Sequence, residues 1–471
     1  MSRVLRRHGA RWLRAAGVAV VGVVATSMSA AQAATTVGSL SFTLTPLTVA
    51  GGNSEPEIAS AANGSLGMVA LDWNQPATNL WTGPFGSVPT FQGSVDTTLR
   101  KAGATTFGGG DADVDQGSTG TLHITDLDFF QNKGSGHFTL GVSAITCPNG
   151  NNPASFSLGA CTAQILDTAG VDRPWITSDG MHVWISYHDS GNSSLIHVQR
   201  SDDDGLTWRK VADPVVGQAQ TTGDATFNNV QGPLVADPST HTLYDIYAAG
   251  ERGELKGRTF TPDRVIVSKS TDGGSTWAAS TVFHMFTAPN QGFGNVFPSL
   301  AADPTNGDLD AVWSDGHTVW LSTSTNQAGS WSSPVAVSTS SLGTALMPWP
   351  AAFNGTLDIV YYGTSATSNM DPTADWFVYM AQSTDGGATF TQSQVNSTTN
   401  HVGVVCTGGT SCGPGTRNLL DLFQVAIDPA NGKAAIIYTD DTMATTPAPN
   451  FSCTGNQDPC PLPEAVLAQQ N

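Results

Sequence analysis

One phrase of sequence recurs seven times, and this repetition constrains the fold more than any other feature. Each copy is a short apolar run, a turn rich in Gly, Asn, Asp and Pro, and a second apolar run that ends near an aromatic or acidic residue. The copies start roughly 50 to 75 residues apart, at positions 56, 112, 173, 232, 298, 348 and 423. Turns such as N-G and D-P-x-x-G supply the backbone angles of a hairpin, so each copy predicts two antiparallel strands.

The spacing of the copies predicts the architecture. A segment of this length holds about four strands, and no segment has sustained helical periodicity. We therefore predict an all-β fold, a β-propeller of four-stranded antiparallel blades, with seven blades and six as the alternative. Only one further strand, at 464–469, is expected after the last copy. The N-terminal segment 40–50 is expected to complete the last blade and close the ring, which removes exposed sheet edges.

A second repeated element is the Asp-box, S-x-D-x-G-x-T-[WF]. It occurs at 201–208, 270–277 and 383–390, with a degenerate copy at 324–331. The Asp accepts hydrogen bonds from backbone N–H groups across the turn, and Gly takes the left-handed conformation. A structural turn between the third and fourth strands of a blade is the favoured interpretation, and ligand contact is the other.

The first 33 residues have the pattern of a secretory signal. Five arginines precede the apolar stretch 15–25, and Ala31-Gln32-Ala33 gives an A-x-A cleavage site. We predict a signal peptide at 1–33 and a single propeller domain at 34–471, in a secreted, extracellular protein. Export by the general or the twin-arginine route stays open.

The net charge and the cysteine content limit which partners and which cellular compartment are expected. Removing five of 19 basic residues and none of 38 acidic ones leaves a net charge of 14 minus 38, or −24. Such an acidic surface argues against nucleic acid and anionic membranes as partners. The six cysteines form three local couples, 147/161, 406/412 and 453/460, which predict disulfide bonds rather than a zinc site.

A ligand site is expected on the face opposite the Asp-boxes, where residues enter the first strand of each blade and leave the second. The residues predicted there are carboxylates, aromatics and arginines, which serve carbohydrate and calcium sites alike. The possible ligand-binding residues are His188, Asp189, Asp315, Asp440 and Asp441. A solvated acidic rim is the alternative for this face.

Three subsets of that face suggest specific chemistry. Arg173, Arg252 and Arg417 can converge on a substrate carboxylate by bidentate pairing; the alternative is that Arg173 and Arg252 pair with their neighbours Asp172 and Glu251. Tyr361 and Tyr362 offer a nucleophilic phenol, with packing as the alternative.

Asp111 and Asp113 open a D-x-D-x-D-x-G sequence. An EF-hand loop starts in this way, but Leu122 stands where such a loop needs an acidic residue. Calcium held by Asp111 or Asp113 in another geometry is therefore kept open, and no cofactor is expected to be required.

The repeated Asp-boxes, together with GGGDADV from 108, DRPWI from 172, DWFVYMAQS from 375 and RNLLDLFQVAID from 417, resemble the sialidase superfamily of secreted β-propellers, also called BNR-repeat proteins. The resemblance covers nearly the whole chain after residue 33. It implies an exo-α-sialidase-like glycoside hydrolase, with an arginine triad for the substrate carboxylate, a Tyr–Glu nucleophile and an Asp acid/base. The family's Arg-Ile-Pro motif is absent, and its enzymes have six blades.

Two functions therefore stand at this point. One is a hydrolase acting on sialylated or other acidic glycans, and the other is a non-catalytic propeller that binds glycans or a protein. In both, the expected partner is a glycan or glycoconjugate, no membrane insertion is expected, and the protein is expected to be a monomer.

Overall fold

The computed structural model describes residues 34–37, 40–49, 52–72, 77–131, 136–190, 195–215, 228–250, 262–285, 297–409, 412–413, 415–443 and 462–471. The predicted signal peptide, Glu251, Arg252 and the 453/460 couple lie outside these residues. The described strands belong to one compact unit. None of the helices in the described ranges has the length and apolar character needed to span a bilayer.

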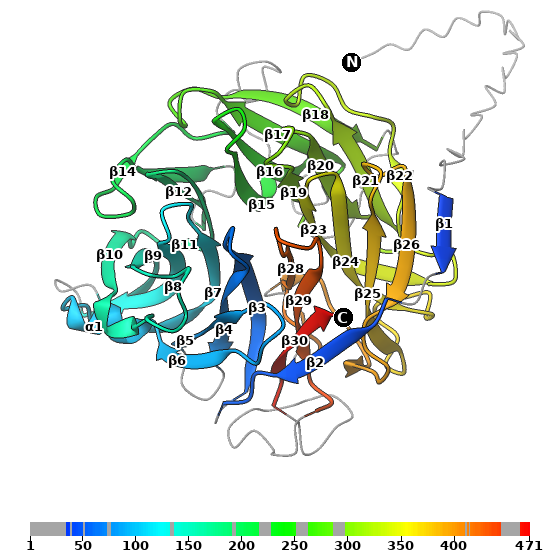
Figure 1. Cartoon of the computed structure of the whole chain (residues 1–471), viewed down its shortest axis with the longest axis horizontal. Coiled ribbons are helices and arrows are strands. Elements are labelled where there is room, and N and C mark those ends of the chain that lie inside the picture. The colour runs from blue at the N-terminus through cyan, green and yellow to red at the C-terminus, as the bar shows by residue number, and fades with distance from the viewer. Residues whose placement is uncertain are drawn as a thin grey trace, which may run out of the picture. The chain divides into compact units, whose positions relative to one another are not determined.

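The strands form a seven-bladed β-propeller, as predicted (Figure 1). Every blade is an antiparallel sheet whose strands follow one another from the centre outwards. The first three blades are β3 (Asn53–Ser60), β4 (Ser65–Asp72), β5 (Ala77–Pro84) and β6 (Thr90–Ser94); β7 (Thr106–Gln116), β8 (Leu122–Gln131), β9 (Phe138–Cys147) and β10 (Thr162–Asp167); and β11 (Val171–Asp179), β12 (His182–Asp189), β13 (Ile196–Ser201) and β14 (Arg209–Lys210).

The next three blades have the same order. They are β15 (Asn228–Asp237), β16 (Thr242–Gly250), β17 (Arg264–Ser270) and β18 (Ala278–His284); β19 (Ser299–Ala302), β20 (Leu309–Ser314), β21 (Val319–Ser324) and β22 (Val335–Ala336); and β23 (Thr344–Phe353), β24 (Thr356–Thr364), β25 (Asp375–Ser383) and β26 (Thr389–Gln394). On the sixth blade, β1 (Ala34–Val37) pairs in parallel with β26, and β27 (His401–Val402) pairs with β25. The described helices are α1 (Asp96–Lys101) and the 3₁₀ turn Leu158–Ala160.

The seventh blade is built from both ends of the chain. It consists of β28 (Gln424–Ile427), β29 (Ala434–Asp440), β30 (Glu464–Gln470) and β2 (Phe42–Pro46). Strand β2 pairs antiparallel with β30, from Phe42 opposite Gln470 to Pro46 opposite Val466. The predicted closure by the N-terminal strand is therefore confirmed, and the innermost strands of neighbouring blades contact one another around the whole ring.

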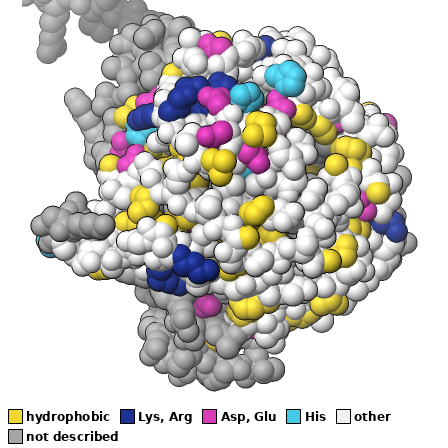
Figure 2. All heavy atoms as spheres, turned by 60° about the vertical axis from the view of Figure 1, so that its left-hand side comes forward, with side chains coloured by type: hydrophobic (Ala, Val, Ile, Leu, Met, Phe, Trp, Pro, Cys, Tyr) yellow, Lys and Arg dark blue, Asp and Glu magenta, His cyan; other side chains and the backbone are white. Residues whose placement is uncertain are grey.

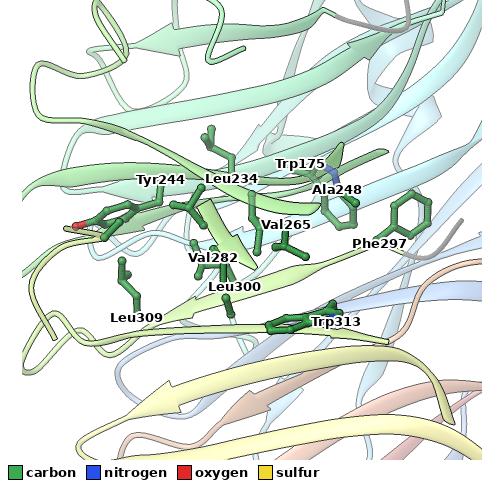
Figure 3. Packing of buried hydrophobic residues seen from close by; sticks show 14 of the residues in the cluster. Trp175, Leu234, Tyr244, Ala248, Val265, Val282, Phe297, Leu300, Leu309 and Trp313 are labelled. Carbon is green, nitrogen blue, oxygen red and sulfur yellow. The ribbon is translucent and has the colours of Figure 1, made fainter. Parts of the chain in front are cut away.

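The core lies between the blades. Strand β12 alternates along its sequence, yet its central side chains are buried on both faces because a blade lies on either side. One cluster of buried residues joins the third, fourth and fifth blades, and includes Trp175, Tyr244 and Trp313 (Figure 3). On the side of the molecule in Figure 2, Lys and Arg side chains lie beside Asp, Glu and His side chains in one region near the top, and hydrophobic side chains are scattered over the rest of the face.

The four predicted S-x-D-x-G-x-T turns connect the third and fourth strands of their blades. In the turn that starts at Ser383, Asp385 accepts hydrogen bonds from the backbone N–H and the hydroxyl of Thr389, at 2.9 and 2.7 Å. In the degenerate copy, Asn326 accepts from the backbone N–H of Ser330 at 2.9 Å. The turns at 201 and 270 have the same hydrogen bonds as the one at 383.

Two of the three predicted disulfides are confirmed. Cys147 and Cys161 join the third and fourth strands of the second blade, with Cα atoms 4.2 Å apart. Cys406 and Cys412 staple the segment that leads into the seventh blade, with Cα atoms 5.9 Å apart.

Candidate functional site

A repeated backbone irregularity shapes one end of the central channel. The register of the innermost strand shifts at its start in β3, β11 and β23, each time at a residue followed by proline. These residues are Glu55, Arg173 and Met347, and all three have φ of 53°. A non-glycine residue with positive φ costs about 1–3 kcal/mol and is held only where the surroundings fix it. The same backbone irregularity therefore places three different side chains at equivalent positions around the propeller.

Glu55 and Arg173 belong to a network of charged side chains. Arg173 Nη2 lies 3.4 Å from Asp421 Oδ2, and Arg417 donates a hydrogen bond to the same oxygen. The backbone N–H of Asp421 donates to Glu55 Oε1 at 3.2 Å. The network joins the first, third and seventh blades, which lie far apart in sequence. We call it, with Asp111 and Asp172, the mouth cluster.

Asp111, from the second blade, completes the mouth cluster through Glu55. Burial, and then the charges of Asp111 and Asp421, raises the pKa of Glu55 well above its usual value. Burial, and then the charge of Asp172, raises the pKa of Asp111 to about 7. The hydrogen bond between Glu55 and Asp111 raises the pKa of Glu55 and lowers that of Asp111. The pair therefore retains a proton near neutral pH.

The guanidinium groups are positioned from two sides. Arg173 lies over the ring of Phe297, 4.1 Å from its centroid. Burial lowers the pKa of Arg173, but the neighbouring carboxylates, led by Asp421, more than offset this and raise it. The side chains of Arg173 and Arg417 are 20% and 26% exposed, so a ligand can still reach them.

Aromatic rings block the channel deeper along the same strands. The ring centroids of Trp175 on β11 and Trp349 on β23 are 5.3 Å apart. The two side chains meet although β11 belongs to the third blade and β23 to the sixth, with two blades between them. Figure 3 shows Trp175 in the core beside Phe297. The mouth cluster therefore lies at one end of a channel that is closed beneath it.

Asp113, which the sequence offers as a metal ligand, ties innermost strands together. Its Oδ2 accepts the backbone N–H of Ile176 at 2.9 Å. Its Oδ1 accepts the N–H of Val114 at 2.8 Å and the amide of Gln424 at 3.3 Å. Burial raises the pKa of Asp113 to about 7.

The predicted residues Asp315 and Asp440 hold turns at the ends of second strands. Asp315 Oδ1 accepts the backbone N–H groups of His317 and Thr318, at 2.9 and 2.8 Å. Asp440 Oδ1 accepts the N–H of Thr442 at 2.8 Å. These carboxylates are engaged with their own backbone.

Asp441 and Asp189 each contact a histidine. Asp441 Oδ2 lies 2.8 Å from His401 Nδ1, and both side chains are buried. Asp189 Oδ2 lies 3.2 Å from His197 Nε2. His188 is partly exposed and lies opposite Asp172 in the strand pairing.

Tyr361 and Tyr362 lie between blades. The hydroxyl of Tyr361 donates to Gln392 at 2.7 Å, and that of Tyr362 accepts the N–H of Thr439 at 3.1 Å. Burial raises the pKa of both phenols. All seven tyrosines of the chain are in the described residues; six are fully buried, and the seventh, Tyr379, stacks on Tyr361. Among the described residues, the hydrogen bonds and ion pairs given above for the mouth cluster involve no tyrosine hydroxyl.

The structure brings together Asp111, Asp172, Arg173 and Arg417 from the sequence prediction, and adds Glu55, Asp421 and Phe297. Glu55 and Asp421 stand where the sequence enters the first strand of a blade. Phe297 precedes Pro298 as Arg173 precedes Pro174. The position before the proline of a repeat is the signal that finds Glu55 and Phe297, whereas Asp421 is followed by leucine.

No protein-family model matches the chain, and no curated protein does. Among solved structures, the fucose-recognising lectin of Aleuria aurantia, a six-bladed β-propeller, is 13% identical over 75% of this chain and 99% of its own, with a TM-score of 0.42. The phage phi92 endosialidase is 10% identical over 92% of this chain and 69% of its own (TM-score 0.45). The Hadza microbial sialidase Hz136 is 12% identical over 79% and 70% (TM-score 0.44).

Proposed function

We propose that this protein is exported and acts on glycans at the mouth cluster, as a glycoside hydrolase whose chemistry comes from carboxyl groups. The observation that carries the proposal is the hydrogen-bonded pair Glu55–Asp111, which keeps a proton near neutral pH beside further carboxylates and two arginines. Export is supported by the 1–33 sequence and by the two disulfides.

The pair supplies the acid that glycoside hydrolysis requires. Cleavage of a glycosidic bond needs a proton on the leaving oxygen as the bond to the anomeric carbon breaks. Asp111, the more exposed partner of the pair, gives that proton, since its pKa is raised to about 7. A water attacks the anomeric carbon, and Asp172 takes a proton from that water.

The arginines favour an acidic sugar. Each guanidinium has five N–H donors, and the contacts of Arg173 and Arg417 with Asp421 Oδ2 use few of them. A sugar carboxylate pairs with the remaining donors. Because the tyrosines lie between blades, we place the chemistry on carboxyl groups instead of a tyrosine nucleophile.

A second function is a non-catalytic propeller that binds glycans. The specific observation in its favour is that both arginines already form ion pairs with Asp421, as in a stable ionic network. In this case the mouth cluster presents hydrogen-bonding groups to sugar hydroxyls without proton transfer.

Sugar release from a panel of sialylated, uronic-acid and neutral oligosaccharides tests the proposal. We expect turnover of an acidic substrate, and we expect Asp111→Asn and Glu55→Gln each to reduce it about 10²-fold or more. The matched control is Asp358→Asn, which alters another buried carboxyl whose pKa is raised to about 7, on β24. No release across the panel, together with glycan-array binding lost in Asp111→Asn, would establish the binding function instead. Equal losses of activity in Asp111→Asn and Asp358→Asn would refute a specific role for the pair.

A further inference from the structure

Three buried aspartates meet where the first blade joins the second, away from the mouth cluster. Asp96 begins α1, directly after the outermost strand of the first blade, and Asp126 and Asp128 lie on β8 of the second blade. All three side chains are fully buried. One carboxylate oxygen from each lies within 4.8 Å of those of the other two.

Several of the oxygens in this group lack a hydrogen-bond donor. Asp96 Oδ2 accepts a hydrogen bond from the backbone N–H of Thr78 at 2.9 Å. Asp126 Oδ1 accepts one from the hydroxyl of the same Thr78 at 2.6 Å. Among the described residues, the other oxygen of each, Asp96 Oδ1 and Asp126 Oδ2, has no hydrogen-bond partner. Asp128 lies within hydrogen-bonding reach of the Thr106 hydroxyl and of Asp96. Buried polar atoms are rarely left without a partner, so this group is short of positive charge.

The described residues place little positive charge near these three carboxyl groups. Arg100 is the cation that acts on Asp128, and its side chain is exposed. The three buried carboxyl groups lie within 4.8 Å of one another in a low-dielectric interior. Their negative charges therefore need a compensating cation nearby.

The geometry selects the cation. Calcium binds oxygen ligands at about 2.3–2.6 Å, which places ligands on opposite sides of the ion up to about 5 Å apart. Magnesium binds at about 2.0–2.1 Å, demands octahedral geometry and keeps several waters, for which a fully buried group is unsuited. Carboxylates together with a hydroxyl form a hard-oxygen donor set that suits calcium.

We propose that Asp96, Asp126 and Asp128 form a calcium site that fastens the first blade to the second. The ion contacts one oxygen of each of the three carboxylates, with Thr106 Oγ1 as a neutral donor. Its position links the segment after β6 to the second strand of the next blade, so it stabilises the interface between these two blades. This site is independent of the function proposed for the mouth cluster.

Calcium titration of the EDTA-treated full chain tests the proposal, by calorimetry and by thermal unfolding. We expect one calcium ion per chain, and a midpoint raised by about 3 °C at a free calcium concentration ~100 times Kd. Asp128→Asn is expected to abolish both effects. Asp245→Asn is the matched control, because Asp245 on β16 is also fully buried but lies on the fourth blade, outside the group of three; the variant should bind calcium as the wild type does.

Several results would overturn the site. These are no binding at millimolar calcium, binding retained in Asp128→Asn, or loss in Asp245→Asn as well. Binding lost in Asp111→Asn but kept in Asp128→Asn would place the ion at the mouth cluster instead.

A second variant does not depend on the folding of Asp128→Asn. Asp96→Asn, outside the sheets, should weaken calcium binding at least tenfold. Unchanged affinity contradicts the proposal.

Discussion

Asp358 on β24 gives a direct test of how burial controls the carboxyl groups of this propeller. Its side chain is fully buried, Oδ1 accepts from Gln382 Nε2 at 2.9 Å, and Oδ2 has no partner. Burial raises its pKa from 3.8 to about 7. Between these values the folded chain holds a proton that the unfolded chain releases. The stability that this carboxyl contributes below pH 3.8 is therefore lost as the pH rises through 7.

The size of this effect follows from the two pKa values. The difference is 7 minus 3.8, or about 3 pH units, and each unit corresponds to about 1.4 kcal/mol. Ionisation of Asp358 thus costs the folded state up to about 4 kcal/mol at pH 8. Asp358→Asn removes the ionisable group while keeping the acceptor for Gln382. Relative to the wild type, it should gain up to about 4 kcal/mol between pH 4 and pH 8, which is ~5 °C in the unfolding midpoint for a chain of this length.

The assay is thermal unfolding of wild type and variant at pH 4 and pH 8. Asp385→Asn is the control: Asp385 is exposed, and hydrogen bonds from Thr389 lower its pKa to about 2. It is ionised at both pH values in the folded state, so its substitution should shift the midpoint by nearly the same amount at each. A midpoint difference for Asp358→Asn that is equal at pH 4 and pH 8 would refute the reasoning.

Three further predictions concern the mouth cluster, the core and the closing strand. Glycan turnover should fall as the pH rises above about 7, because Asp111, whose pKa is raised to about 7, then loses its proton; a pH–rate profile that is flat from pH 6 to 9 contradicts the acid role. Trp175→Ala should destabilise the fold by about 3–5 kcal/mol, since it empties a fully buried position, and denaturant unfolding at constant pH measures the loss. Deleting residues 34–46 should expose the edge of β30 and produce aggregates in size-exclusion chromatography, whereas deleting 34–37 alone should leave a monodisperse protein.

The sequence predicts the fold closely because its signals are local. Each blade repeats a hairpin whose turn residues set the backbone angles, and the count of copies equals the count of blades. The last strand, expected at 464–469, is found at Glu464–Gln470. The C-terminal end of the chain provides only three of the four strands of the last blade, so the N-terminal strand must supply the fourth.

The site is harder to predict because ring geometry decides which side chains meet. Strand ends identify the face, but the contact of Arg173 with Asp421 depends on how two distant blades approach each other. The alternation of side chains along a strand cannot tell a residue that faces the channel from one that faces the next blade when both faces of the blade are buried. Tyr361 and Tyr362 are adjacent in sequence, and both are fully buried. An acidic residue after a strand, such as Asp315, equally well holds its own turn.

The pairing of β2 with β30 also has a consequence for synthesis. The first of these strands leaves the ribosome more than 400 residues before its partner, so the ring stays open throughout translation, with an unpaired edge at each end. The completed toroid can form only after the final blade has been made. A ribosome that stalls late should therefore yield a chain with six nearly complete blades and an unpaired strand edge at each end. Chaperones and proteases should act on such a chain.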